Sequence, residues 1–352
     1  MKVIHIADCH LLMEPEKGTP IGALRRKEIM EIVPRIVEVC NAEEADLLLI
    51  AGDLFHKAPR LMDLRELDHI LSGLVHTKVV LIAGNHDYIG PRSYYTNYPW
   101  KARVTMLTDG ELSHIAFPEL RTTVYGFSYH TRDITEPLYD DVAPVGEGIH
   151  ILLAHGGDAK NVPMNYKKID LAGFDYAALG HIHKKEILTP RMAYAGSVEP
   201  LDRNETGEHG YMRVDIVEEA GEHRTEVTFV PFSQREYRDI TVMVDGNSTN
   251  ASIGETIKAM IAELGAKHLY RVALLGKRNE ELVPDTEAFL GLGNITEIID
   301  RTLPEYDLKA LRKANADNLL GMFIEALSEE NGEDAEIREK ALYYGLSALL
   351  NK

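Results

Sequence analysis

KVVLIAGNHD, at residues 78–87, is an apolar run that ends abruptly in polar side chains. The run has the length and the β-branched content of a buried strand. Asn85, His86 and Asp87 follow it, and side chains of these types bind metals or transfer protons. In α/β folds ligands bind in the loops past the carboxyl ends of strands. This stretch therefore predicts a strand that leads into a functional site.

Four further stretches repeat the arrangement of an apolar run followed by metal-type side chains. They are KVIHIADCH at 2–10, ADLLLIAGD at 45–53, IHILLAHGGD at 149–158 and DYAALGHIH at 175–183. Apolar residues at helical spacing over 22–40 and 60–75 predict helices between the runs. Pro34 lies inside the first helix and predicts a kink or a break there. The alternation indicates an α/β core whose strands deliver their polar side chains to one edge.

The pattern changes after residue 185. Residues 191–230 read as β-hairpins, and residues 237–300 as strand, helix, strand, short helix and strand, which is typical of a small α+β domain. The remainder is helical, with a break at 331–334. We therefore predict a catalytic domain over 1–235, an α+β capping domain over 236–305 and a C-terminal helical region over 306–352 that is a candidate partner-docking segment.

The composition narrows the class of protein. The chain has 352 residues, 45% of them hydrophobic, and no run approaches the roughly 20 apolar residues that span a bilayer. Two cysteines, Cys9 and Cys40, make no disulfide framework, and the N-terminus lacks a signal-peptide pattern, so we expect a reduced, cytoplasmic protein. The net charge of −18 argues against a large basic face for nucleic acid. It does not exclude a nucleic-acid enzyme, because a metal pair makes its own site cationic.

Carboxylate, imidazole and amide groups follow the predicted strands and together form a candidate metal site. In an extended segment residues i and i+2 share a face, which groups Asp8 with His10 and His181 with His183. The full ligand set is Asp8, His10, Asp53, Asn85, His155, His181 and His183. Seven ligands are too many for one ion but suit two ions about 3.5–4 Å apart, with Asp53 as the bridge. This chemistry fits Mn²⁺ first, with Fe²⁺ and Zn²⁺ as alternatives.

The five motifs in this order, Asp-x-His, Gly-Asp, Gly-Asn-His-Asp, His and Gly-His-x-His, resemble those of the calcineurin-like metallophosphoesterases over about residues 1–235. The resemblance implies a four-layer fold of two mixed sheets flanked by helices. It implies that Asp8, His10, Asp53 and His183 hold one metal, and that Asp53, Asn85, His155 and His181 hold the other. It further implies in-line attack on a phosphodiester by a hydroxide that bridges the metals, with His86 assisting at the scissile phosphate and Asp87 orienting His86.

Finer details resemble one branch, the SbcD-type DNA-repair nucleases. They are Gly-Asp-Leu-Phe-His at 52–56, Gly-His-Ile-His followed by Lys184, Tyr-x-Gly-Ser at 194–197 and the stretch from Glu199 to Gly210. The resemblance implies a DNA exonuclease or endonuclease of DNA repair, in which His56 helps to position the DNA phosphate. It also implies an SMC-like coiled-coil ATPase partner and a homodimer.

Other interpretations of the sequence remain open. The same core serves small-molecule or cyclic-nucleotide phosphodiesterases, which have no evident need for the last third of the chain. A non-catalytic scaffold would not be expected to keep every ligand and His86. Arg25, Arg26, Lys27, Lys184 and Lys185 either contact a nucleic-acid backbone or form a solvated face.

Several residues have structural interpretations. Cys9 is expected in the core, and the aromatic run from Tyr94 to Trp100 is expected to pack against the sheet rather than to stack bases. His5, His114 and His150 lack partner motifs and are expected to be structural or surface residues. The last helix carries an apolar stripe that docks on its own chain or on a partner, formed by Leu342, Leu346, Leu349 and Leu350. Because ligand histidines bind metal only when neutral, metal affinity is expected to fall below about pH 6.

Overall fold

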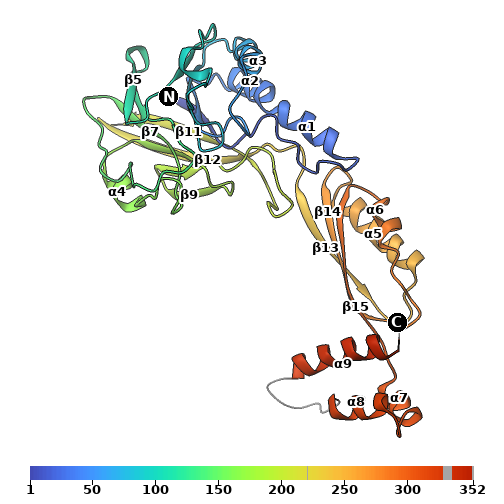
Figure 1. Ribbon diagram of the computed structural model, residues 1–352. Helices are drawn as coiled ribbons and strands as arrows, with labels where there is room; N and C mark the ends of the chain where they lie inside the picture. Colours follow the sequence, from blue (N-terminus) through green and yellow to red (C-terminus); the bar gives the residue numbers. More distant parts are fainter. Residues whose placement is uncertain (220, 328–334, 351–352) are drawn as a thin grey trace. The chain divides into compact units, whose positions relative to one another are not determined.

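The computed structural model describes residues 1–219, 221–327 and 335–350 (Figure 1). The chain forms two compact units, Met1–Tyr237 and Arg238–Lys352. Among the described residues, no helix has the length and apolar character that crossing a membrane requires.

The first unit contains a mixed sheet in the order β12-β11-β1-β2-β3-β4. Its parallel strands are β1 (Lys2–Ile6), β2 (Leu47–Ala51), β3 (Lys78–Ile82) and β4 (Val104–Met106). β11 (Gly210–Glu219) runs antiparallel to β1 and forms a hairpin with β12 (Glu222–Pro231). The three runs predicted from residues 2–10, 45–53 and 78–87 are therefore adjacent strands at the centre of one sheet.

A second mixed sheet has the order β5-β6-β7-β8-β10-β9. Its strands are β5 (Ser113–Phe117), β6 (Thr122–Gly126), β7 (Ile149–His155), β8 (Tyr176–Gly180), β9 (Glu186–Thr189) and β10 (Met192–Tyr194). β7 and β8, which were predicted from their apolar runs, lie parallel at its centre. The five predicted strands thus belong to two sheets and not to one edge.

The two sheets pack face to face with helices outside them. Alternate residues of β1, β2 and β3, such as Ile4, Leu48 and Leu81, pack with the helices α1 (Gly22–Met30), α2 (Ile32–Ala42) and α3 (Leu61–Leu71). The intervening residues, such as Val3 and Leu49, pack against Ile151 and other residues of the second sheet. The outer face of that sheet packs with α4 (Tyr166–Leu171), on the side away from α1–α3 in Figure 1. The predicted four-layer sandwich is confirmed.

The helix break predicted at Pro34 is observed, but it lies three residues earlier, at Glu31. The helical pattern over 22–40 is interrupted at Glu31, between α1 and α2. A proline clashes with the carbonyl of the residue four positions earlier, which here is Met30. The first helix therefore ends at Met30, and Pro34 lies in the first turn of α2, where its missing N–H costs nothing.

The second unit contains a three-stranded sheet, β13-β14-β15. β13 (Tyr237–Val244), β14 (Leu269–Arg278) and β15 (Ile295–Pro304) pack with α5 (Asn250–Leu264) and α6 (Thr286–Leu290) around a core that includes Ile257 and Val272. β14 and β15 are parallel. The predicted order of strands and helices is observed here.

Three helices complete the second unit, namely α7 (Leu308–Ala314), α8 (Leu319–Leu327) and α9 (Ala335–Leu349). Leu342 and Leu346 of α9 are buried against Tyr306 and Ile324, so this part of the predicted stripe docks on its own chain. Leu349 is exposed. The break predicted at 331–334 lies outside the described residues.

Candidate metal centre

The seven predicted ligands gather where the carboxyl ends of strands from both sheets meet. The Nε2 atom of His10 lies 3.2 Å from the Nε2 atom of His183. The Oδ1 atom of Asn85 lies 3.0 Å from Nε2 of His155 and 3.2 Å from Nδ1 of His181. The loops after β1 and β3 thus lie beside His155, which ends β7, and beside the loop after β8.

Asp53 lies between the two groups. Its Oδ2 atom is 3.7 Å from Nε2 of His10 and 3.5 Å from Nε2 of His155. Donor atoms of Asp8, His10 and His183 all lie within 4.8 Å of one another, and so do those of Asp8, Asp53 and His155. Metal–nitrogen bonds of about 2.0–2.1 Å place neighbouring donor atoms roughly 3.0–3.4 Å apart. The spacing therefore fits divalent cations, with Asp53 in reach of both positions.

Several of the predicted ligands have left-handed backbone and not the extended backbone of a strand. Asp8, His10, Asp53 and His181 have φ values of 49°, 46°, 48° and 96°. The expectation that residues 8–10 and 181–183 are extended, so that i and i+2 share a face, is therefore wrong. Left-handed backbone in residues other than glycine costs about 1 kcal/mol or more each and collects at functional sites. The loops turn tightly to bring successive side chains into one place.

Glycines beside the ligands serve two purposes. Gly52 has φ +85° and supplies the turn before Asp53. Gly84 and Gly180 instead supply space, because a Cβ atom on Gly84 would collide with the Asp53 carboxylate and one on Gly180 with the Ala51 carbonyl. At these two positions the close approach of neighbouring strand ends, and not a turn, requires glycine.

The ligand loops are tied to one another by hydrogen bonds. The N–H of Asp8 donates to the Gly52 carbonyl at 3.2 Å, and that of His10 to the Asp53 carbonyl at 3.0 Å. The N–H of His86 donates to Oδ1 of Asp53 at 2.8 Å, and that of His181 to Oδ2 of Asp8 at 3.0 Å. Each carboxylate therefore holds a second ligand loop while another of its oxygen lone pairs faces the donor cluster.

The family model described as calcineurin-like phosphoesterase matches residues 1–185, which is more than half of the chain. The chain belongs to this family. The resemblance inferred from the five motifs is confirmed, and the unit that holds the site is a metal-dependent phosphoesterase domain.

Similar proteins include the following three. The uncharacterized metallophosphoesterase YhaO of Bacillus subtilis is 28% identical over 60% of this chain and 57% of its own. The DNA double-strand break repair protein Mre11 of Methanocaldococcus jannaschii is 30% identical over 58% of each chain. The Mre11 protein of Methanopyrus kandleri is 26% identical over 90% of this chain and 84% of its own. The match thus spans little more than half of the first two relatives.

The predicted ligands differ in their pKa values because each has different charged neighbours. Burial alone would raise the pKa of Asp53, but His155 and His10 outweigh it and hold that pKa well below its usual range. Burial lowers the pKa of His155, but Asp53 outweighs this and raises it to about 9. Burial raises the pKa of Asp8 to about 6. The metal-free site thus holds a protonated His155 at neutral pH, and metal binding must displace that proton.

His183 is the second predicted ligand with a raised pKa. Burial lowers its pKa, but the hydrogen bond and charge of Glu205, together with the charge of Asp8, raise it to about 9. The loss of metal affinity below about pH 6 stays a prediction, and the raised pKa values of these two histidines favour a loss that begins at higher pH.

Two carboxylates at the site were not predicted from the sequence. Asp158 lies 2.8 Å from Nε2 of His181, and Glu205 lies 2.6 Å from Nδ1 of His183. Asp158 ends the quoted stretch at 149–158, and Glu205 lies in the stretch from Glu199 to Gly210, yet neither has a spacing that predicts a ligand. Only the position of Asp158 three residues beyond His155 could have drawn attention to it.

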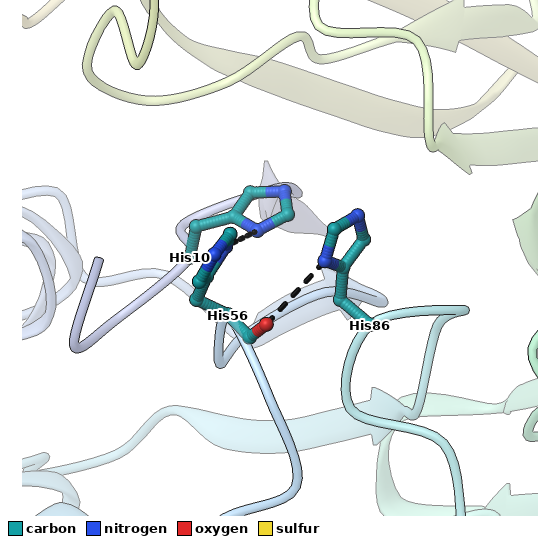
Figure 2. Close-up of side chains that lie close together, drawn as sticks. All are labelled: His10, His56 and His86. Atoms are coloured by element: carbon teal, nitrogen blue, oxygen red, sulfur yellow. Dashed lines mark hydrogen bonds between the residues drawn. The ribbon is translucent and has the colours of Figure 1, made fainter. Parts of the chain in front are cut away.

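Figure 2 shows that His56 and His86 lie beside His10. Nδ1 of His10 lies 3.3 Å from Nδ1 of His56, and Nδ1 of His86 lies 3.3 Å from the His56 carbonyl oxygen. Burial and the neighbouring His86 lower the pKa of His56. If Nε2 of His10 faces a metal, its Nδ1–H donates to His56, and Nε2 of His56 then carries a proton to offer a ligand.

Asp87 is buried between ligand loops. It accepts hydrogen bonds from the N–H groups of Gly84 and Phe55, at 2.8 and 3.1 Å, and from the Tyr95 hydroxyl at 2.9 Å. Burial and the charge of Asp53 raise its pKa to about 7. These contacts join the loops after β2 and β3, and the orienting role for His86 stays a prediction.

Other predicted residues fall where simple packing explains them. Cys9 is buried in the core, as expected, and both cysteines are free. Tyr95 is buried, and Tyr98 and Trp100 pack against the same core. Arg25 is fully buried, where it pairs with Glu28 and Glu199, so it is not available to a nucleic acid.

The three histidines without partner motifs lie where structural or surface residues are expected. His5 and His150 are buried. His114 is exposed on β5.

Proposed function

We propose that this protein is a two-metal phosphodiesterase that cleaves DNA, as a nuclease of DNA repair. Asp8, His10, Asp53 and His183 hold one divalent metal, and Asp53, Asn85, His155 and His181 hold the other. His86 and His56 act on the substrate side, and Asp87 orients His86. Mn²⁺ is the proposed ion, with Fe²⁺ and Zn²⁺ as alternatives, since the donor set is oxygen and imidazole.

One observation carries this proposal, namely that Asp53 lies within 3.7 Å of His10 and 3.5 Å of His155, which belong to different predicted ligand sets, while two further histidines lie beside His10. Ring centroids of His10 and His86 are 4.8 Å apart, and those of His56 and His86 are 5.3 Å apart. A metal pair supplies a water nucleophile near neutral pH and neutralises phosphoryl oxygens. His56 and His86 add donors on one side of that centre.

The residues of the chain would then divide the work. Asp53 places both ions and fixes the His86 backbone through its 2.8 Å hydrogen bond. His86, half-buried and at the rim of the donor cluster, donates a hydrogen bond to a phosphoryl oxygen or a proton to the leaving oxygen. His56, kept neutral by its lowered pKa, offers an N–H to a non-bridging oxygen of the phosphodiester.

A basic cleft beside His56 supports a polynucleotide substrate. The cleft has a volume of about 530 Å³ and contains four cationic side chains, those of Lys17, Arg26, Lys57 and Arg60. Its acidic residues are Glu14, which pairs with Lys17 and Arg26, and Asp63, which pairs with Arg60. A net positive cleft in a chain of net charge −18 is suited to the phosphate backbone of a nucleic acid.

A second cleft continues past Arg60. It has a volume of about 500 Å³ and is lined by Arg60, Arg92, Tyr88 and Tyr94 among others. Cations beside Tyr94, which is exposed, favour a strand whose bases stack on an aromatic ring. The naming of two relatives as DNA double-strand break repair proteins supports the same substrate.

The second unit has proposed roles that follow from this function. Residues 236–305 would form the α+β capping domain, and residues 306–352 would dock an SMC-like coiled-coil ATPase. Exposed apolar side chains on α8 and α9 support docking, namely those of Leu319, Met322, Ile337 and Tyr344. A homodimer and a cytoplasmic location are part of the same proposal.

A second candidate is a phosphodiesterase for nucleotides or cyclic nucleotides. The strongly acidic surface implied by a net charge of −18 favours it, because long polyanions are repelled more than small ones. Such an enzyme needs the same metal centre, but it does not use the two clefts that Arg60 lines.

The deciding experiment is a Mn²⁺-dependent activity assay on the full chain. End-labelled double- and single-stranded DNA, bis-p-nitrophenyl phosphate and cyclic nucleotides are compared, with Asp53→Ala as the blank. DNA cleavage that the blank lacks supports the nuclease. Turnover of small diesters with intact DNA would transfer the assignment to the small-molecule phosphodiesterase.

A further inference from the structure

Each histidine of the Gly-His-Ile-His motif has one ring nitrogen on the donor cluster and the other on a carboxylate. His181 has Nδ1 3.2 Å from Oδ1 of Asn85 and Nε2 2.8 Å from Oδ2 of Asp158. His183 has Nε2 3.2 Å from Nε2 of His10 and Nδ1 2.6 Å from Oε1 of Glu205. The two rings therefore turn opposite nitrogens toward the site, although only one residue separates them in the chain.

This arrangement decides which nitrogen can bind a metal. A neutral imidazole has one N–H and one lone pair, and a metal needs the lone pair on the nitrogen that faces it. An ionised carboxylate only accepts hydrogen bonds, so it selects the tautomer whose outward nitrogen carries the proton. Asp158 thus leaves the Nδ1 lone pair of His181 for the site, and Glu205 leaves the Nε2 lone pair of His183.

Both carboxylates are themselves fixed in place. The Oδ1 atom of Asp158 accepts the N–H groups of Lys160 and Asn161 at 2.7 and 2.9 Å. The Oε2 atom of Glu205 accepts the N–H of Leu201 at 2.9 Å and the Ser197 hydroxyl at 3.1 Å. In each residue one oxygen is bonded to its own loop while the other reaches a histidine. Both carboxylates are therefore held by their own loops in a position to orient a ring, although the Asp158 side chain is 47% exposed.

The other two histidine ligands are held differently. The Nδ1 atom of His155 lies 2.8 Å from the Ala51 carbonyl oxygen, so the backbone sets its tautomer. The Nδ1 atom of His10 contacts His56. Removing a single carboxylate should therefore disturb His181 or His183 alone.

We propose that Asp158 and Glu205 are positioning residues, each of which orients one histidine ligand and selects its tautomer for one ion of the pair. Asp158 serves the ion held with Asn85 and His155, and Glu205 serves the ion held with Asp8 and His10. The proposal rests on the ligand sets given above.

The test is calorimetric titration of Mn²⁺ into the metal-free full chain. Asp158→Ala and Glu205→Ala are compared with two controls, Asp141→Ala and Glu208→Ala, whose carboxylates pair with Lys168 and Lys185. We expect each variant to weaken one of two binding steps by about 10- to 100-fold and to leave the other step unchanged, as removal of an outer partner of a ligand does. The controls should bind like the unaltered chain.

Two readouts separate positioning from stability. Glu205→Asp and Asp158→Glu should recover part of the lost affinity, and ¹⁵N spectra of the zinc-loaded chain should show metal on Nδ1 of His181 and Nε2 of His183. Equal affinity in all variants, or an equal loss in both steps for each variant, overturns the proposal. If the unaltered chain binds two ions but does not cleave DNA, only the nuclease assignment fails; if it binds none, both fail.

Discussion

His5 and His155 are both fully buried in the same domain, and their protonation is opposite. Burial lowers the pKa of His5 to about 3, and its Nδ1 lies 2.8 Å from the Tyr176 hydroxyl. The pKa of His155 is raised to about 9, because the charge of Asp53 outweighs burial. His5 lies within β1, between the sheets, whereas His155 is the last residue of β7.

The comparison teaches that burial and function are separate properties. A buried histidine with a neutral partner stays neutral and holds two sheets together. A buried histidine beside a carboxylate is charged until a cation replaces its proton. The partner, and the position at the end of the strand, make the difference.

The largest effect should come from removing the partner of His155. Asp53→Asn keeps the shape but loses the charge that serves both proposed ions, so we expect both ions to be lost and turnover of bis-p-nitrophenyl phosphate to fall about 1,000-fold or more. The pKa of His155 should fall, which would make it resemble His5. Metal analysis after gel filtration and histidine NMR measure these changes. Retention of two ions would contradict the bridging role.

His86→Ala tests a histidine that resembles neither His5 nor His155, since it is half-buried and faces the proposed substrate. We expect two bound ions and a turnover reduced about 100-fold, the size of a typical general-acid contribution. Steady-state kinetics and metal analysis check it, with His76→Ala, an exposed histidine, as the control. Turnover near that of the control would remove His86 from the mechanism.

The pH dependence of metal binding sharpens the contrast. Both His155 and His183 have pKa values raised to about 9, so each is protonated at pH 7 in the metal-free chain. Binding should release about two protons, and affinity should rise with pH up to about 9, by up to about 100-fold per pH unit for two protons. Titration in buffers of different ionisation enthalpy counts the protons. Release of none would show that the histidines are already neutral.

The smallest effect concerns His5 itself. Its folded pKa of about 3 lies below the unfolded value of 6.5, so the unfolded chain takes up a proton first and stability falls as pH drops below 6.5. Between pH 6.5 and 5 we expect the unaltered chain to lose about 2 kcal/mol relative to His5→Gln, which can still bond Tyr176 but does not titrate. Urea unfolding at both pH values measures it, with His114→Gln as the control. An unchanged difference would mean that the pKa of His5 is the same in the folded and the unfolded chain.

The sequence predicted the central strands because each is a short apolar run that ends in polar residues. β1, β2, β3, β7 and β8 were found in this way. The strands at 104–126 were not predicted, since β5 and β6 lie toward the edge of the second sheet and their alternation is broken by polar and aromatic residues. Nor does a periodic pattern say that strands belong to two sheets, because that depends on which faces meet.

The site was predicted as far as the motifs extend. The predicted ligands lie in short local patterns, so the donor cluster could be named in advance. Asp158 and Glu205 contact predicted ligand histidines and their own loops, and their distance from His181 and His183 in the chain carries no spacing signal. Left-handed backbone at Asp8 and Asp53 was likewise beyond a pattern of residue types.

The pairing of β1 with β11 also fixes when the centre can exist. Residues 2–5 lie against residues 212–215, so the strand that carries Asp8 and His10 gains its second neighbour only after more than 200 further residues are made. Contacts of such separation form late and slowly. We therefore expect β1, and with it the loop that holds Asp8 and His10, to reach its final position only after β11 has been made.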